Sequence, residues 1–316
     1  MSKPRILISS KSFGVHCREA IETLNSFAEV ETKLITSPDQ MRDAVNNFDG
    51  IVLGNEKADE DILMNATRLK IIARHGVGVD NIDLKAATKK GIVVTYTPYA
   101  NSDSVAEYTI AHILNVMKSI PKANLGVLNG GWNRFLGFEL MGKTVGIVGF
   151  GAVGKRVVKK LQGFDVKIMA YDPFVKLEEF GKAGVMASDL ESLLKVSDVI
   201  TLHVALTPET KHLMNLDRLK LMKKESYLIN MSRGAIVDEE ALCEVLKEKG
   251  IAGAALDVFE QEPISKDSPL LTLDNVVLTP HNANFTLESL RRTDMMNATD
   301  LERFFKGEKP VNIANP

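Results

Sequence analysis

Short runs of apolar residues alternate with longer amphipathic segments along most of the chain. A short apolar run rich in β-branched residues, without polar alternation, is typical of a strand that is buried on both faces of a parallel sheet. The runs that fit this pattern are residues 5–9, 30–34, 50–53, 69–74, 92–96, 144–149, 166–171, 199–204, 227–231, 253–258 and 276–279. Helical periodicity falls between them, for example over residues 15–26, 38–46, 152–162, 190–195 and 239–249.

The alternation of strand and helix predicts an α/β protein whose parallel sheets are covered by helices on both faces. The chain has 316 residues, which exceeds the roughly 100–200 residues of a usual domain. We therefore expect two doubly wound parallel-sheet (Rossmann-like) domains with an active-site cleft between them. The first would comprise residues 1–100 and about 287–316, and the second would comprise residues 101–286.

The predicted boundary falls in a helix near residues 104–117, which would leave the first domain and start the second. The segment Gly130-Gly131-Trp132 has no periodicity and suggests a loop between the two domains. Trp132 would then be a packing anchor of the interdomain or dimer region, or a cover for the active site. The last helix, at about residues 286–305, and the residues after it would fold back onto the first domain.

Composition excludes few classes of protein but narrows the list of partners. Hydrophobic residues make up 45% and charged residues 25% of the chain, as in ordinary globular proteins. A formal net charge of -2 gives no electrostatic reason to expect nucleic acid or an anionic membrane as a partner. Two distant cysteines, Cys17 and Cys243, argue against a disulfide framework. With no secretory signal pattern at the N-terminus, we expect a cytoplasmic protein.

A glycine motif, Gly149-Phe150-Gly151-Ala152-Val153-Gly154, has the spacing G-x-G-x-x-G. It joins a predicted strand to a predicted helix, and Asp172 ends the next strand. Gly149 would permit a tight turn, Gly151 would let the backbone approach a pyrophosphate, and Gly154 would let helix and strand pack closely. The Asp172 carboxylate would bind ribose hydroxyls and repel a 2′-phosphate. The pattern predicts a site for NAD rather than NADP; the alternative is a glycine-rich turn that binds nothing.

Three charged or titratable residues, Arg233, Glu262 and His281, follow predicted strands of the same domain. Ligands of doubly wound sheets bind at the carboxyl ends of the strands. Reduction of a 2-keto acid needs a cation for the carboxylate and the polarised carbonyl, and a proton donor. A guanidinium, and an imidazole oriented by a carboxylate, supply that chemistry. Each residue also has a structural alternative, since strand ends and turns use the same side chains.

The chain resembles the D-isomer-specific 2-hydroxyacid dehydrogenase family, and most of all its phosphoglycerate dehydrogenase-like subgroup without an added regulatory domain. The resemblance covers nearly the whole chain, and the segments that carry it are residues 74–83, 101–107, 149–154, 230–238, 256–263 and 279–281. It implies an NAD-dependent oxidoreductase that acts on a CH–OH group. The substrate would be a small 2-hydroxy or 2-keto acid of the 3-phosphoglycerate, glyoxylate or hydroxypyruvate type. The resemblance also implies a homodimer.

The resemblance implies roles for individual residues. Arg233 would hold the substrate carboxylate and carbonyl, His281 would exchange the proton, and Glu262 would orient His281. Backbone N–H groups around Val77 and Gly78 would bind the substrate carboxylate. Besides the glycines, the residues lining the NAD site would be Thr97, Val105, Ala152, Val153, Asp172, His203, Val204, Met231, Ser232 and Asp257.

Several interpretations stay open at this level. Arg74 and His75 either reach an anionic substrate or pack the loop that follows them, and His203 is either a cofactor residue or a buried strand residue. His16, His112 and His212 have no ligand-like spacing, so we expect no metal. Asn282 and Asn284 flank Ala283 where the family more often has an apolar residue and then small ones, which leaves the substrate undecided.

Two other functions remain possible. A formate dehydrogenase would share the layout, but its chemistry needs no acid, and similar enzymes place a glutamine where Glu262 stands. An NAD(H)-sensing, corepressor-like binding protein would use the same fold for association with a partner.

Overall fold

The computed structural model describes residues 3–315, and these form two compact units. Unit 1 is the described part of Met1–Asn101 and Asn284–Pro316, and unit 2 is Ser102–Ala283. The sequence pattern put the boundaries near residues 100 and 286. Each unit is an α/β body with its own parallel sheet, which confirms the predicted fold class. The cleft expected between the units stays a prediction.

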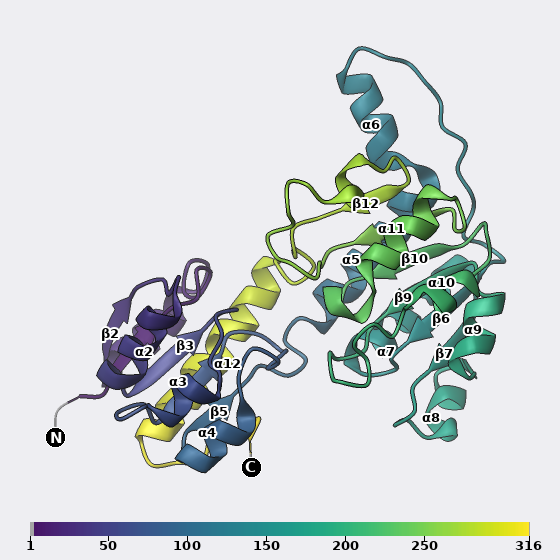
Figure 1. Ribbon diagram of the computed structural model, residues 1–316. Helices are drawn as coiled ribbons and strands as arrows, with labels where there is room; N and C mark the ends of the chain where they lie inside the picture. The colour runs from purple at the N-terminus through teal and green to yellow at the C-terminus, as the bar shows by residue number, and fades with distance from the viewer. Residues whose placement is uncertain (1–2, 316) are drawn as a thin grey trace. The chain divides into compact units, whose positions relative to one another are not determined.

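Unit 1 is built on a five-stranded parallel sheet with the order β2-β1-β3-β4-β5. Its strands are β1 (Arg5–Ile8), β2 (Glu29–Thr32), β3 (Gly50–Leu53), β4 (Ile71–Arg74) and β5 (Val93–Thr95). Its helices are α1 (Arg18–Phe27), α2 (Pro38–Asn47), α3 (Glu60–Met64), α4 (Leu84–Lys90) and α12 (Leu287–Phe305). Figure 1 shows α12, in yellow, crossing the sheet formed by the first part of the chain. The last helix therefore belongs to unit 1.

The sheet of unit 1 is buried on both faces except at its edge strand β2, because alternate residues of β1, β3, β4 and β5 enter different clusters. Leu7 and Ile72 pack in one cluster, whereas Ile6, Ile8 and Ile71 pack in a second cluster that includes apolar residues of α12. This arrangement explains why the strands read as continuous apolar runs rather than as alternating patterns.

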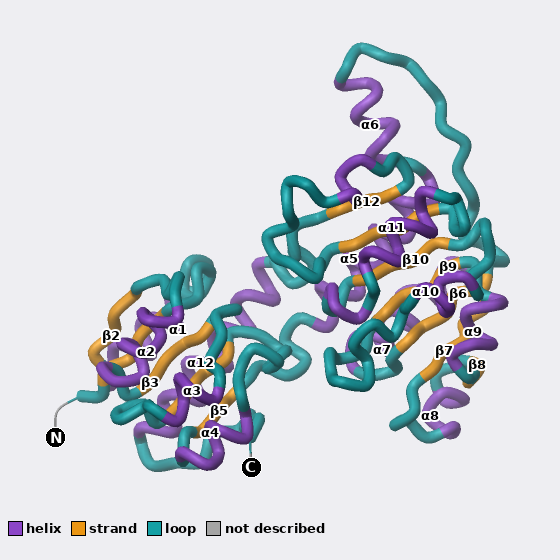
Figure 2. The backbone as a smooth tube through the Cα atoms, viewed as in Figure 1, coloured by secondary structure: helices purple, strands orange, loops and turns teal. Residues whose placement is uncertain are grey.

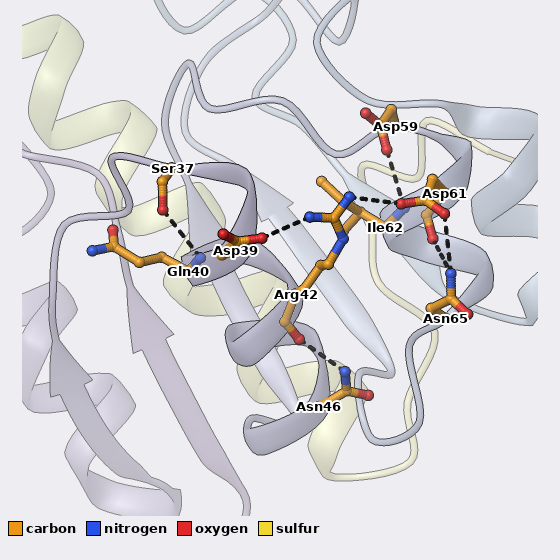
Figure 3. Close-up of polar contacts among 9 residues, drawn as sticks. All are labelled: Ser37, Asp39, Gln40, Arg42, Asn46, Asp59, Asp61, Ile62 and Asn65. Atoms are coloured by element: carbon orange, nitrogen blue, oxygen red, sulfur yellow. Dashed lines mark hydrogen bonds and ion pairs between the residues drawn. The ribbon is translucent and has the colours of Figure 1, made fainter.

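Polar side chains determine where α3 begins (Figure 3). The Asp59 carboxylate accepts a hydrogen bond from the N–H of Ile62, which is the usual bond of an N-cap aspartate. Arg42 of α2 pairs with Asp39 in its own helix at 2.8 Å and with Asp61 of α3 at 2.9 Å. Exposed pairs of this kind contribute little each, but the Asp59 cap fixes the end of the loop that joins β3 to α3.

Unit 2 is built on a seven-stranded parallel sheet with the order β12-β11-β10-β9-β6-β7-β8. Its strands are β6 (Thr144–Val148), β7 (Lys167–Tyr171), β8 (Met186–Ala187), β9 (Val199–Leu202), β10 (Tyr227–Asn230), β11 (Gly253–Leu256) and β12 (Val276–Leu278). Its helices are α5 (Ser102–Lys118), α6 (Ile120–Leu128), α7 (Ala152–Leu161), α8 (Leu177–Lys182), α9 (Leu190–Val196), α10 (Leu216–Lys220) and α11 (Glu239–Lys247). Three 3-10 turns, η1 (Gln162–Phe164), η2 (Gly234–Ile236) and η3 (Pro269–Thr272), complete it. Figure 2 shows the strands in orange with helices on both sides.

One prediction about the segment after α5 was wrong. Residues 130–132 form a loop inside unit 2 rather than between the units, because α5 has already entered unit 2 and α6 follows it after one residue. Trp132 is 84% exposed in the described chain, and its expected place in a dimer region or over the active site stays a prediction. No helix within residues 3–315 has the length and apolar content to cross a lipid bilayer.

Candidate active site

The glycine motif forms the turn between β6 and α7. Gly149 has φ +97°, and a Cβ on it would lie 2.6 Å from the carbonyl carbon of His203. A Cβ on Gly154 would lie 2.2 Å from the carbonyl oxygen of Gly149, so only glycine fits at both positions. At Gly151 a Cβ would meet nothing within 4 Å among the described residues. That open space lies at the N-terminus of α7, where no side chain caps the helix, and it suits a pyrophosphate.

Asp172 connects this loop to the next strand. Its Oδ2 accepts a hydrogen bond of 2.9 Å from the N–H of Phe150 in the glycine loop, and its Oδ1 accepts one of 2.9 Å from the N–H of Phe174. The carboxylate borders a pocket of about 330 Å³, whose other lining residues are Tyr171, Val175, Leu177, Phe180, Ala187, Ser188 and Asp189. Apolar walls with carboxylates at the rim suit a flat heterocycle and the hydroxyls of a ribose, and disfavour an added phosphate.

The three predicted catalytic residues follow three adjacent strands. Arg233 follows β10, Glu262 follows β11 and His281 follows β12, so all leave the carboxyl edge of the sheet. The structure brings two of them into direct contact, with His281 Nδ1 2.7 Å from Glu262 Oε2. Their side chains are 32% and 34% exposed, so a ligand can reach the pair.

Opposing effects determine the charge of Glu262. Burial raises the pKa of Glu262. The hydrogen bond and charge of His281, the N–H of Phe259 and the charge of Arg233 lower it by more than burial raises it. The pKa of Glu262 therefore lies below its ordinary value of 4.5. Glu262 is therefore a carboxylate near neutral pH. Because that carboxylate accepts the Nδ1 proton, Nε2 of His281 is the ring nitrogen left to exchange a proton with a ligand.

The turn that carries His281 is held by Asp257, whose side chain is fully buried. Asp257 Oδ1 accepts hydrogen bonds from Thr279 Oγ1 at 2.6 Å and from the N–H of Asn282 at 2.8 Å, and Oδ2 accepts one from the N–H of Ala283 at 2.8 Å. The N–H of His281 donates to the Asp257 carbonyl at 2.7 Å. These bonds stabilise the left-handed backbone of His281, which has φ +51°. The Asp257 carboxylate thus supports the turn of His281, a role that the sequence did not predict.

His112 extends this support, and sequence reasoning gave it no role. Its Nε2 lies 3.2 Å from Thr279 Oγ1, and its Nδ1 lies 3.1 Å from the carbonyl oxygen of Tyr108. Burial lowers the pKa of His112 below its ordinary value, so the ring is neutral near pH 7. No spacing along the chain could have revealed the contact, because His112 and Thr279 are 167 residues apart.

The remaining predicted residues of unit 2 lie around the same edge of the sheet. His203 follows β9, and its Nε2 lies 2.9 Å from Thr201 Oγ1. The residue is partly accessible, yet protein surrounds its ring, and this burial lowers the pKa of His203 to about 3. Ala152 and Val153 open α7, whereas Val105 and Met231 are buried in one apolar cluster. Val204 and Ser232 are partly exposed in the segments after β9 and β10.

The loop after β4 in unit 1 is held by the side chain of Arg74, which is only 7% exposed. Its Nε donates to the carbonyl of Gly78 at 2.8 Å, and a terminal nitrogen donates to Asn55 Oδ1 at 2.9 Å. A second terminal nitrogen donates to the carbonyl of His75. These bonds favour loop packing over direct substrate contact for Arg74, while Val77 and Gly78 stay partly exposed. Thr97, which follows β5, is fully buried.

Both ring nitrogens of His75 have hydrogen-bond partners. Nδ1 lies 2.8 Å from Ser10 Oγ, and Nε2 lies 2.6 Å from Asp294 Oδ1. Asp294 also accepts the N–H of Gly14 at 2.9 Å. The ring therefore lies inside unit 1, which again favours the packing interpretation. Within residues 3–315 no group of three or more His, Cys, Asp or Glu side chains could hold a metal ion.

Comparison with known proteins agrees with this geometry. The family model described as D-isomer specific 2-hydroxyacid dehydrogenase, NAD binding domain, matches residues 110–283. The chain is 42% identical to a D-3-phosphoglycerate dehydrogenase of Methanocaldococcus jannaschii over 94% of this chain and 57% of that protein. It is also 42% identical to a glyoxylate reductase of Thermococcus litoralis, over 99% of this chain and 97% of that protein.

A solved structure gives the same result. D-lactate dehydrogenase from Aquifex aeolicus, complexed with NAD and lactic acid, superposes with a TM-score of 0.89 at 32% identity, over 99% of both chains. The chain spans little more than half of the phosphoglycerate dehydrogenases that it matches, 57% and 55% of two archaeal examples. Its motifs, its two parallel sheets and these similarities show that the chain belongs to the D-isomer specific 2-hydroxyacid dehydrogenase family.

Proposed function

We propose that this protein is an NAD-dependent oxidoreductase that interconverts a small 2-hydroxy acid and the corresponding 2-keto acid. The observation that carries the proposal is the 2.7 Å bond between His281 and Glu262, at the same sheet edge as Arg233 and the glycine loop. An accessible imidazole oriented by a carboxylate is the proton donor that carbonyl reduction needs.

In this proposal unit 2 is the NAD-binding domain. The residues that would hold the cofactor are Thr97, Val105, Gly149, Gly151, Ala152, Val153, Gly154, Asp172, His203, Val204, Met231, Ser232 and Asp257. The uncapped α7 N-terminus and the open space at Gly151 support the pyrophosphate position, and the pocket beside Asp172 supports the adenosine position. When bound, NADH supplies a hydride to the carbonyl carbon.

The residues of the chain handle the proton and the charges. In the reductive direction His281 Nε2 donates a proton to the carbonyl oxygen while the carbonyl carbon receives the hydride, and in the oxidative direction it takes the proton back. Glu262 keeps the ring oriented and stabilises its protonated form. Arg233 binds the substrate carboxylate and stabilises the charge that grows on the oxygen. Unit 1 is the substrate-binding domain, and its N–H groups around Val77 and Gly78 bind the carboxylate.

The proposal is tested by NADH oxidation with glyoxylate, hydroxypyruvate, pyruvate and 3-phosphohydroxypyruvate. We expect turnover with at least one of them, and its loss in Arg233→Ala. The matched control is Arg18→Ala, because Arg18 is an exposed arginine of α1. An Arg233→Ala enzyme with wild-type kcat/KM would contradict the assigned role. Reduction of NAD+ with formate, without turnover of any keto acid, would favour the formate dehydrogenase instead.

We further propose a homodimer that forms through α6 and the loop after it. No residue of α6 is buried, and the segment carries a set of exposed apolar side chains: Ile120, Leu125, Val127, Leu128, Trp132 and Leu136. So many exposed apolar side chains in one short segment favour an interface. Figure 1 shows α6 and its loop extending from the rest of unit 2.

The dimer is tested by sedimentation. Leu128→Asp should give a monomer, whereas Val311→Asp, at an exposed apolar residue of unit 1, should leave the dimer intact. A wild-type monomer at micromolar concentration would refute the dimer.

Both cysteines, Cys17 and Cys243, are free and buried, which supports a reducing, cytoplasmic location.

A further inference from the structure

Glu56 lies at the centre of the carboxyl edge of the sheet in unit 1. It belongs to the loop after β3, and β3 is the middle strand of the five. Because the strands are parallel, the loops after β1 and β4 leave the same edge on either side of it. The loop after β4 contains Val77 and Gly78, which the proposed function assigns to the substrate carboxylate. The two loops are in contact, because Asn81 of the loop after β4 donates to the carbonyl of Glu56.

One oxygen of the Glu56 carboxylate has a partner and the other does not. Oε1 accepts a hydrogen bond from Ser9 Oγ at 2.9 Å. Oε2 is buried and has no hydrogen-bond partner among residues 3–315. A Cβ on Gly54 would lie 2.9 Å from Oε2, so the carboxylate rests directly on the end of β3. A buried acceptor without a donor is costly, and a ligand group that donates a hydrogen bond would remove that cost.

The loop that carries Glu56 is held in place at both ends. Asn81 Nδ2 donates to the carbonyl of Gly54 at 3.1 Å and to the carbonyl of Glu56 at 2.7 Å. On its far side the loop ends at Asp59, whose carboxylate caps α3 through the N–H of Ile62 (Figure 3). A fixed backbone limits how far the carboxylate can move away from a ligand of the same charge.

The hydrogen bonds given for the cations at this edge go to groups other than Glu56 Oε2. The guanidinium of Arg74 donates to two carbonyls of its own loop and to Asn55. Lys11 and Lys57 follow β1 and β3, but both are exposed, and water and salt screen the attraction of such side chains for an anion. Glu56 therefore presents a carboxylate oxygen that is buried and has no hydrogen-bond partner among residues 3–315.

We infer that Glu56 is a specificity-determining residue that selects 2-keto acids without a second negative group. A hydroxyl on the carbon beyond the keto group can donate to the partly exposed carboxylate of Glu56, whereas a phosphate or second carboxylate would face a carboxylate of like charge. The substrate class is then glyoxylate and hydroxypyruvate rather than 3-phosphohydroxypyruvate. The inference rests on the proposed function, and it separates two activities that the names of similar proteins leave open.

The test compares kcat/KM for the three keto acids in the wild type and in Glu56→Gln. The wild type should use glyoxylate and hydroxypyruvate at least about tenfold better than 3-phosphohydroxypyruvate. Glu56→Gln should raise kcat/KM for the phosphorylated substrate about tenfold and change that for glyoxylate less than about twofold, and Glu56→Lys should raise it further. Glu60→Gln, an exposed glutamate in the first turn of α3, is the matched control and should change none of the three.

The outcomes separate the two proposals. Glyoxylate turnover with an unchanged substrate ratio in Glu56→Gln, or a wild type that prefers the phosphorylated acid, overturns the role of Glu56 and leaves the oxidoreductase intact. No turnover of any keto acid overturns the proposed function and this inference with it. Should Glu56→Gln not fold, inhibition of the wild type decides: D-glycerate should compete with glyoxylate more strongly than 3-phosphoglycerate does, and the reverse order overturns the inference.

Discussion

The two units each contain an imidazole paired with a carboxylate at nearly the same distance, 2.6 Å for His75 and Asp294 in unit 1 and 2.7 Å for His281 and Glu262 in unit 2. In unit 1 the side chains are 5% and 0% exposed, and Ser10 holds the second ring nitrogen. In unit 2 they are 32% and 34% exposed. Of the two ring nitrogens of His281, Nδ1 is the one with a hydrogen-bond partner among residues 3–315. The same chemical pair thus joins segments of the fold in one unit and can serve a ligand in the other.

The difference comes from where each pair lies along its sheet. Asp294 projects from α12, which covers a face of the sheet, so His75 turns inward to meet it. Glu262 and His281 both lie beyond the ends of adjacent strands, and their side chains stay partly exposed. Side-chain type alone therefore does not identify a catalytic pair; access of a ligand to the free ring nitrogen does.

The largest expected effect is that of His281→Ala. Removing the proton donor should lower kcat for keto-acid reduction by about 10²–10⁴-fold, while the free energy of unfolding changes little because the ring is accessible. Steady-state kinetics and urea unfolding measure the two quantities. A wild-type kcat in this variant would show that the accessible pair of His281 and Glu262 does not supply the proton.

His75→Ala should lower the free energy of unfolding rather than kcat. It leaves the buried Asp294 without its imidazole partner, and loss of one member of a buried pair costs about 3 kcal/mol of unfolding free energy. Urea unfolding measures the loss, with His16→Ala at an exposed histidine of the same unit as control. A variant as stable as the wild type but inactive would mean that His75, too, serves a ligand.

Gly151→Ala extends the comparison to the glycine loop, where a Cβ at Gly151 would have free space and a Cβ at Gly154 would meet backbone atoms. Its methyl group has free space in the protein but would occupy the pyrophosphate position, so the Kd for NADH should rise about tenfold with stability retained. Gly154→Ala, which meets the carbonyl oxygen of Gly149, should instead lower stability. Calorimetric titration and urea unfolding distinguish them, and equal effects of both variants on stability would contradict the model of the loop.

The smallest effect concerns pH and Glu262. The pKa of Glu262 in the folded state lies below its ordinary value of 4.5, so its carboxylate stabilises the folded state above that pH, and the stabilisation is lost as the pH falls through the folded pKa. The stability difference between wild type and Glu262→Gln should therefore shrink as the pH is lowered from neutral to below about 4. Urea unfolding across this range measures it, with Glu22→Gln as the exposed control. A difference independent of pH would argue against a charged Glu262.

Much of the fold was predictable because both sheets are buried on two faces. Their strands read as apolar runs, and every strand except β8 was expected within a few residues. The missed elements are short: α3 and α10 have five residues each, α8 has six, α4 has seven, and β8 has two. Fewer than two helical turns give no measurable period. The nine-residue α6 was missed for another reason, since it buries no face and so has no amphipathic pattern to detect.

The sequence by itself determined the order of the elements, the glycine turn and the positions of Arg233, Glu262 and His281 at strand ends, because these features depend on residues close together along the chain. Only the tertiary structure decided that His75 is buried with both ring nitrogens bonded, whereas His281 is accessible. It also decided how Asp257 and His112 hold the turn of His281, and that one oxygen of Glu56 lacks a hydrogen-bond donor. These features join residues up to 219 positions apart. Burial and hydrogen-bond satisfaction arise only when such residues pack together, so local sequence carries no signal of them.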